Sequence, residues 1–91
     1  MNKDKLYNKS IQIKSIEDLK IIQNFLFELG FKWYFSKYKI KDHIKLNSYI
    51  NIYYEWKNYN EKEFLTFSAK NIFSTININN IIRKEKLKKL C

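Results

Sequence analysis

The residues of this sequence that could do chemistry are few, and the most conspicuous is its single histidine. His43 follows Asp42 and lies between Lys41 and Lys45. Because the pKa of an imidazole lies close to neutral pH, a histidine beside an aspartate can act as a general acid or base. The sequence has no second histidine, no glycine loop for a phosphate and no nucleophile motif that would complete a catalytic set. We therefore expect His43 to be an ordinary loop residue and the protein not to be an enzyme.

Metal and redox chemistry have equally little support in the sequence. Cys91 is the only cysteine, so neither an internal disulfide nor a cysteine-rich metal cage is expected. We predict no metal, no cofactor and a reducing, intracellular setting. No uninterrupted apolar run exceeds three residues, and this pattern predicts neither a signal peptide nor a membrane span.

Binding chemistry is better represented, above all by a basic segment near the end of the sequence. Its five cations fall within seven residues and are Arg83, Lys84, Lys86, Lys88 and Lys89. Such a segment can follow an RNA or DNA backbone or an acidic protein surface, with an affinity that depends on salt. It can equally be a solvated helix end whose positive charge offsets the helix dipole. Its apolar stripe is thin, so we expect no membrane partner.

The sequence as a whole is strongly basic. Eighteen Lys and Arg against nine Asp and Glu give a net charge of +9, which favours phosphate groups or an acidic partner. Nearly half of the residues are Lys, Asn or Ile, the amino acids of AT-rich codons, so the charge can also reflect genome composition. Arginine, which suits bidentate recognition of guanine, occurs only as Arg83. This scarcity of arginine counts against sequence-specific reading of DNA.

Two smaller groups of residues could also contribute to binding. Tyr49 and Tyr53 recur on one side of a predicted strand, and Tyr34 lies on the corresponding side of the preceding one. Aromatic side chains on a sheet can stack single-stranded bases or form hot spots for a protein partner, although tyrosine is also a common half-exposed strand residue. Lys39 and Lys41, in a basic loop, complete the predicted binding residues.

The hydrophobic pattern predicts the elements that position these side chains. Residues 10–14 alternate as a short half-buried strand does. Ser15 and Asp18 form a variant of the capping box, and the apolar residues that follow have the spacing of a helix over residues 16–29. Gly30, the only glycine, lies where a helix needs a left-handed C-terminal residue.

The remainder of the chain alternates in a way that predicts several more strands. We expect Phe35, Trp56 and Ala69 to point inward, because each continues the apolar side of its alternation. Residues 37–47 predict a basic loop, with or without a short edge strand, between the first of these strands and the second. The predicted strands are 31–36, 49–56, 64–69 and a short one at 72–76.

These elements predict an α+β fold in a single domain spanning residues 1–91. We expect a small antiparallel sheet of three to five strands, with the strands at residues 31–36, 49–56 and 64–69 at its centre and the 16–29 helix packed on one face. A basic C-terminal helix begins at Asn79 or Asn80, which can cap it. Its apolar stripe consists of Ile81, Ile82, Leu87 and Leu90. The predicted core consists of Leu19, Ile22, Leu26, Leu29, Trp33, Ile50, Ile52 and Leu65.

The stretch from Ile16 to Trp33, which ends in LFELGFKW, resembles small phage and prophage proteins. In those proteins a strand leads to a helix that closes on an LFELGYxW run, followed by a few strands. This run, the AT-rich composition and the small basic domain together make the chain similar to small anti-CRISPR proteins of low-GC bacteria. These include proteins proposed to act against type VI RNA-guided RNA nucleases. The resemblance implies a non-enzymatic inhibitor, monomeric or a small homo-oligomer. It would act in the cytoplasm of a bacterial host by binding a defence effector protein or its RNA complex.

The order of elements around Gly30 and His43 is also similar to toxin ribonucleases of the HicA type. That family has an α-β-β-β-α fold like a double-stranded-RNA-binding domain, and the resemblance implies a catalytic role for His43. The catalytic histidine of the family follows Gly-Ser in a turn, whereas Lys41 and Asp42 precede His43 here. A small RNA-binding module or a ribonuclease toxin is therefore the alternative function.

Overall fold

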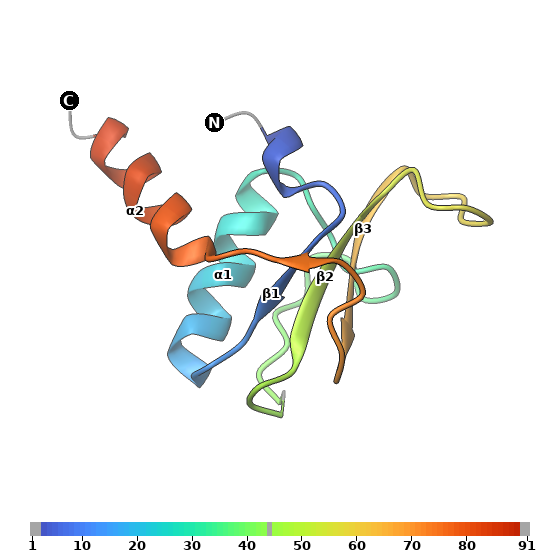
Figure 1. Ribbon diagram of the computed structural model, residues 1–91, viewed down its shortest axis with the longest axis horizontal. Helices are drawn as coiled ribbons and strands as arrows, with labels where there is room; N and C mark the ends of the chain where they lie inside the picture. Colours follow the sequence, from blue (N-terminus) through green and yellow to red (C-terminus); the bar gives the residue numbers. More distant parts are fainter. Residues whose placement is uncertain (1–2, 44, 90–91) are drawn as a thin grey trace.

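The computed structural model describes residues 3–43 and 45–89 of the chain. These residues form an α+β fold, which confirms the predicted fold class (Figure 1). The elements in chain order are the 3-10 helix η1 (Lys3–Leu6), β1 (Lys9–Gln12), α1 (Ile16–Glu28), β2 (Tyr49–Tyr54), β3 (Glu63–Ser68), β4 (Ser74–Thr75) and α2 (Ile78–Lys89).

The four strands form one mixed sheet in the order β3-β2-β1-β4. β2 pairs in antiparallel fashion with both β1 and β3, whereas β4 pairs with β1 in parallel. The predicted all-antiparallel arrangement is therefore wrong at β4, because the chain returns from β3 across β2 and β1 before it pairs. Of the three strands predicted to be central, only β2 is central, beside β1. β3 is an edge strand, and residues 31–36 lie outside the four strands.

Helix α1 begins and ends with the local interactions that the sequence predicts. Ser15 has extended backbone and its Oγ accepts a hydrogen bond from the Asp18 N–H at 3.0 Å, as an N-cap does. Gly30 has a left-handed φ of 98°. The N–H groups of Gly30 and Phe31 donate to carbonyls of the last turn, both at 3.0 Å, which is a Schellman motif. The capping interactions at both ends confirm the predicted helix to within one residue.

The apolar residues of α1 share one core with residues of the sheet face that we call the inner face. Ile11, Ile50, Ile52 and Leu65 lie on that face and are at most 1% exposed. The structure confirms every predicted core residue as buried except Leu29, which is half-buried at the margin. The buried residues that α1 contributes to this core are Leu19, Ile22 and Leu26.

The opposite face, the outer face, carries polar residues that are nonetheless buried. Ser10 and Asn51 are both 0% exposed, and the Ser10 hydroxyl donates to Asn51 Oδ1 at 2.6 Å. Residues 69–73, which connect β3 to β4, cross this face. The N–H of Phe73 donates to Ser10 Oγ at 3.0 Å, and the N–H of Ile72 donates to Asn51 Oδ1 at 3.2 Å. Because buried polar groups require partners, the crossing segment and these side chains hold one another in place.

Residues 31–36 do not form the predicted strand. Trp33 makes one isolated parallel bridge to Leu65 and one antiparallel bridge to Lys37. The residues between Trp33 and Lys37 form a turn, which ends at Lys37 with a left-handed φ of 54°. The alternation therefore stops at Trp33, which is buried, whereas Phe35 is 89% exposed. The prediction that Phe35 points inward is wrong.

Strand β2 ends two residues earlier than predicted. Glu55 has a left-handed φ of 50°, and its N–H donates to the Lys62 carbonyl at 2.7 Å. A left-handed residue breaks the alternation of a strand, so Trp56 packs against Tyr53 of the outer face, with ring centroids 5.5 Å apart. Trp56 is therefore not on the inner face, where we predicted it.

Strand β3 buries side chains on both of its faces. Leu65 is buried and Phe67 is half-buried on the inner face, but Ala69, predicted to point inward, is exposed beyond the end of the strand. Phe64 on the outer face is 0% exposed and stacks on Tyr53 with ring centroids 4.8 Å apart. The alternation did not predict the burial of Phe64, because its cover comes from other parts of the chain.

Helix α2 begins earlier than predicted, at Ile78. The side chain of Asn77, not of Asn79 or Asn80, accepts a hydrogen bond from the first turn, from the Asn79 N–H at 3.2 Å. Ile78 and Ile82 are buried at 3% and 6% exposure, whereas Leu87 is 56% exposed. Only the first turns of α2 are therefore anchored in the core. Three residues of the predictions, Ile44, Leu90 and Cys91, lie outside the described residues.

Candidate binding surfaces

The basic segment predicted from the sequence forms most of α2. Arg83, Lys84, Lys86 and Lys88 are exposed, and Lys89 is the last residue of the helix. Arg83 donates to Asn80 Oδ1 at 3.0 Å, and Lys88 lies 3.6 Å from the carboxylate of Glu85. Figure 1 shows α2 extending away from the sheet at one end of the molecule. Most of the positive charge of α2 therefore faces solvent.

The predicted aromatic surface is largely an internal cluster. Tyr53 is only 9% exposed, because it lies between Phe64 and Phe73, at centroid distances of 4.8 and 5.0 Å. Tyr34 is half-buried, with its centroid 4.9 Å from that of Phe64, and Tyr49 is half-buried as well. The prediction of an open stacking surface is wrong at Tyr53, because Phe73 of the segment 69–73 and Tyr59 of the loop after β2 pack on its ring.

Other aromatic side chains of this region are exposed, and the sequence analysis did not select them. Phe35 is 89% exposed at the turn after Trp33, and Trp56 and Tyr59 are 42% and 43% exposed in the loop after β2. Turn residues such as Phe35 and the left-handed Glu55 decide this exposure. No periodicity in the sequence marks either position.

A buried glutamine holds the basic loop that contains Lys39 and Lys41. Gln23 of α1 is 0% exposed. Its Oε1 accepts from the Lys41 N–H at 2.7 Å and from Trp33 Nε1 at 3.1 Å, and its Nε2 donates to the Lys41 carbonyl at 2.8 Å. The amide thus pairs with the backbone of Lys41 as a neighbouring strand would. The signal that we missed was a glutamine on the buried side of α1, one turn after Leu19.

The loop and β3 enclose a groove, whose inner part has a volume of about 210 Å³. Its walls include Trp33, Ser36 and Lys41 on the loop side and residues 65–67 on the β3 side. The Lys41 ammonium lies 5.2 Å from the centroid of the Trp33 ring, within the range of a cation–π interaction. The groove therefore combines an apolar floor with a positive rim.

A second, more open hollow of about 330 Å³ adjoins the groove along the same loop, and we call it the outer part. Ser36 and Lys41 line both parts, and Lys39, Asp42 and His43 line only the outer part. The Ser36 hydroxyl oxygen is buried and has no hydrogen-bond partner among the described residues. It is a polar atom that an occupant of the groove could pair with.

Charge pairs connect the turn after Trp33 to the loop after β2. Glu61 lies 3.3 Å from the Lys37 ammonium and 3.4 Å from that of Lys32. The hydrogen bond from Lys37, aided by the charge of Lys32, lowers the pKa of the Glu61 carboxyl. The two loops at this end of the molecule are therefore linked while Glu61 is ionised.

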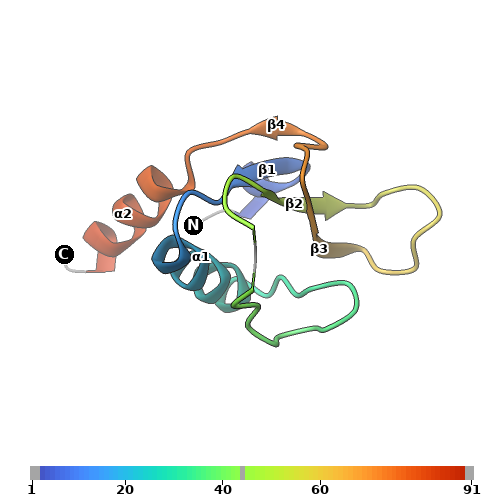
Figure 2. The ribbon, with the colours of Figure 1, turned by 90° about the horizontal axis from the view of Figure 1, so that it is seen from below.

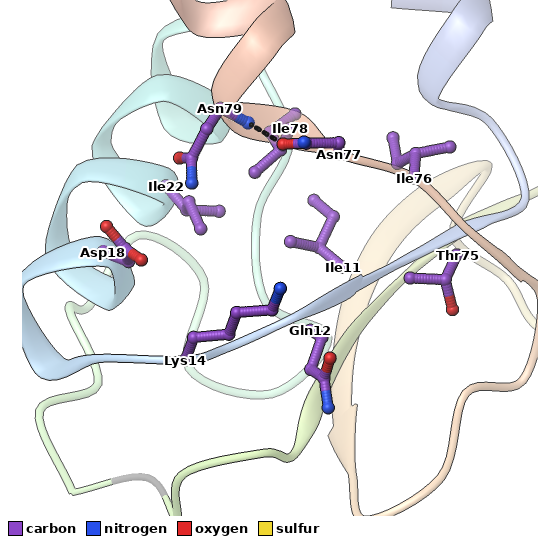
Figure 3. Close-up of a pocket in the computed structure, with 10 residues that line it drawn as sticks. All are labelled: Ile11, Gln12, Lys14, Asp18, Ile22, Thr75, Ile76, Asn77, Ile78 and Asn79. Atoms are coloured by element: carbon purple, nitrogen blue, oxygen red, sulfur yellow. Dashed lines mark hydrogen bonds between the residues drawn. The ribbon is translucent and has the colours of Figure 1, made fainter.

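A separate cavity of about 290 Å³ lies between α1, β1 and the segment that leads from β4 to α2. Figure 3 shows Ile11, Ile22 and Ile78 at its apolar side, and Lys14, which precedes α1, and Asp18, in the first turn of α1, at its polar side. Because its rim carries one positive and one negative side chain, the cavity does not select an anion or a cation.

The histidine does not lie within a group of catalytic side chains. The His43 side chain is 95% exposed, and its Nε2 is 3.3 Å from Asp42 Oδ1. Across residues 3–43 and 45–89, no three His, Cys, Asp or Glu side chains come together in a way that could hold a metal ion. The geometry around His43 provides a polar loop, without a second acid or base in contact.

The structure separates the predicted binding residues into two groups. Figure 2 shows α2 at one end of the molecule, the loop between β2 and β3 at the other, and the loop that follows α1 between them. The long axis of the molecule measures 42 Å. Lys39, Lys41 and Tyr34 belong to the loop after α1, and the remaining predicted cations belong to α2.

The chain was compared with protein-family models, with characterised proteins and with solved structures, and no significant match was found in any of the three comparisons. Among the described residues there is also no helix with the length and apolar character that crossing a bilayer requires.

Proposed function

We propose that this chain is a non-catalytic inhibitor that docks α2 against a negatively charged surface of a host defence effector, either the effector protein or its RNA complex. The proposal includes a mobile-element origin and the cytoplasm of a bacterial cell as the site of action. These two parts rest on the resemblance of the LFELGFKW run to phage and anti-CRISPR proteins. The docking part rests on the arrangement of α2.

The observation that carries the docking proposal is the contrast between the two ends of α2. Ile78 and Ile82 anchor its first turns in the core, while the later residues extend from the body of the molecule. Between Arg83 and Lys89 the helix carries five cations and one acid, Glu85. No acid pairs with Lys84 or Lys86 in the part of the chain that the structure describes. A solvated array of positive charge attracts a negative partner and speeds its association.

The first experiment compares two variants that change the net charge equally. One replaces Lys84, Lys86 and Lys88 with Glu, and the control replaces Lys20, Lys57 and Lys70, which are exposed elsewhere. Each tagged protein is used to capture partners from a lysate of a low-GC bacterium at low and high ionic strength. We expect the wild type and the control to retain a protein partner and the α2 variant to lose it. We expect the loss to be largest at low salt, because steering by charge is screened at high salt.

A second experiment separates a protein partner from bare nucleic acid. The capture is repeated after nuclease treatment, and purified protein is titrated with single-stranded RNA. Tight binding of bare RNA without any protein partner would replace the proposal with an RNA-binding module. Cleavage of RNA by the purified wild type, lost in His43→Ala, would replace it with a ribonuclease.

A further inference from the structure

The outer edge of β3 is unpaired beyond Leu65. The Leu65 N–H donates to the Lys32 carbonyl at 2.8 Å, and the Leu65 carbonyl accepts from the Tyr34 N–H at 3.0 Å. The backbone of Leu65 therefore points away from β2. The backbone groups of an antiparallel strand point to alternate sides from one residue to the next. The N–H and C=O of Phe67, two residues after Leu65, therefore also point away from β2, toward the free edge of β3. Neither group has a partner among the described residues.

The chain itself already uses this edge once. The segment from Lys32 to Tyr34 adds to β3 in parallel at Leu65 and then turns away, at the turn that Lys37 closes. The groove begins where the segment leaves, and residues 65–67 form its β3 wall. Unpaired strand edges are normally covered, charged or shortened, because they can accept another strand. At Phe67 the edge opens into a groove instead.

We propose that the edge of β3 at Phe67 is a strand-addition site for an extended acidic segment of a protein partner. The backbone of the segment pairs with the Phe67 N–H and C=O, as in other cases of strand addition. A side chain beside the pairing residue enters the apolar part of the groove, next to Trp33. This site is distinct from α2 and does not depend on the docking role proposed for that helix.

The charges around the groove select an acidic occupant. Lys41 lines both parts of the groove and Lys39 lines the outer part, whereas Asp42, the one acid there, lies 3.3 Å from His43. A carboxylate that reaches the groove therefore meets two ammonium groups. The hydroxyl of Ser36, buried and without a partner in the described structure, offers the segment an additional hydrogen bond. A second copy of this chain is a poor occupant, because each copy carries a net charge of +9.

The test begins with a displayed library of random decapeptides, selected on the full chain. We expect enriched peptides that contain Asp or Glu within an alternating apolar pattern. The most enriched peptide is then synthesised with a fluorophore and titrated against the wild type, Phe67→Pro and Phe67→Leu. Proline is tolerated at an edge strand where its N–H would face outward.

The backbone contact distinguishes the two substitutions at Phe67. Phe67→Pro removes the pairing N–H and should weaken binding about tenfold or more, whereas Phe67→Leu keeps the N–H and should stay within about threefold. Hydrogen exchange of the wild type provides the same test without a substitution. Saturation with the peptide should slow exchange of the Phe67 N–H about tenfold or more and leave Thr66, which already faces β2, unchanged.

The charge contact is tested by Lys39→Glu combined with Lys41→Glu, against Lys20→Glu combined with Lys57→Glu. The first pair should weaken peptide binding about tenfold and the second pair far less, because only the first lines the groove. The α2 variant should bind the peptide as the wild type does. A failure of this site is therefore separable from a failure of the α2 proposal.

Several results would overturn the site. Selection could enrich no peptide, or peptides without acidic residues. The selected peptide could bind Phe67→Pro as tightly as the wild type, or leave exchange of the Phe67 N–H unchanged. Sedimentation that showed a dimer abolished by Phe67→Pro would assign the edge to a second copy. A single-stranded RNA oligonucleotide that displaced the peptide and required Lys39 and Lys41, but not the Phe67 N–H, would assign the groove to RNA.

Discussion

The two faces of the sheet are buried by different means. On the inner face, the apolar residues of α1 cover Ile11, Ile50 and Ile52, which lie within a continuous hydrophobic core. On the outer face, the side chains of Ser10 and Asn51 accept hydrogen bonds from the backbone of a short crossing segment and so attach it to the sheet. The inner face thus depends on the hydrophobic effect, which has no direction, and the outer face depends on hydrogen bonds of defined geometry.

This difference determines which surfaces are left for binding. The crossing segment brings Phe73 over Tyr53 and converts the predicted tyrosine surface into an aromatic cluster. The exposed chemistry is consequently found on α2 and along the edge of β3. The following predictions test the contrast between the faces, in order of expected effect.

The inner face should be the most sensitive to loss of apolar volume. Leu26 is 0% exposed on α1, and Leu26→Ala should lower the free energy of unfolding by about 2 to 5 kcal/mol. Ile21 is on the same helix but 46% exposed, so Ile21→Ala is the matched control, with a loss of about 1 kcal/mol or less. Urea denaturation measures both values. A loss at Leu26 no greater than that at Ile21 would contradict the described packing of α1.

The outer face should be sensitive to loss of a polar group. Asn51→Ala leaves the Ser10 hydroxyl and the Ile72 N–H without their acceptor, at a cost of about 1 to 3 kcal/mol. Hydrogen exchange of the Ile72 N–H should accelerate at the same time, because the crossing segment loses its attachment. Asn60→Ala, in an exposed loop, serves as the control for the amino-acid change. Slow exchange at Ile72 in the Asn51 variant would show that other contacts hold the crossing segment.

Gly30 follows α1 and ends it with a left-handed backbone conformation. A substitution at Gly30 therefore tests a local backbone contribution to stability, which we expect to be smaller. Its φ of 98° is unfavourable for a residue with a Cβ. The nearest atom that an added Cβ would meet is Lys3 Nζ at 3.6 Å, an ordinary contact. Gly30→Ala should therefore cost about 1 kcal/mol through the backbone alone. A much larger loss in urea denaturation would imply a steric clash that the structure does not contain.

Tyr7 should give the smallest effect, visible only at high pH. Its ring stacks on Tyr54 at a centroid distance of 3.8 Å. Desolvation, aided by the charge of Glu63, raises the pKa of Tyr7 from 10.0 to about 12. The folded state disfavours the phenolate, so the neutral Tyr7 ring contributes to the stability of the fold. This contribution is complete below pH 10 and is lost as the pH rises through about 12.

The measurement for Tyr7 is the pH dependence of urea denaturation, together with a phenolate absorbance titration. Tyr7→Phe should remove the highest of the tyrosine transitions and should flatten the decline in stability over that pH window. An unchanged set of transitions in Tyr7→Phe would assign the raised pKa to another tyrosine.

Local signals in the sequence determined α1, the core and most of the strands. Ser15 and Gly30 act at the two ends of α1 through neighbouring residues, so their effects can be predicted without knowledge of the fold. The apolar spacing between them, and the alternation around Ile11 and Ile50, select the buried side chains of the inner face. The basic character of α2 was equally evident, although its N-cap is Asn77.

Only the tertiary structure decided what covers the outer face and which strand edge stays open. Alternation indicates that two faces of a strand differ, but it does not reveal whether a distant segment lies on the polar one. Asn51 is bonded to Ile72, 21 residues away, and Ser10 to Phe73, 63 residues away. Alternation likewise predicted a strand over residues 31–36, but the chain turns between Trp33 and Lys37. The backbone N–H and C=O of Phe67 are therefore left without a partner among the described residues. These features arise from contacts between remote residues, and such contacts leave no periodic mark in the sequence.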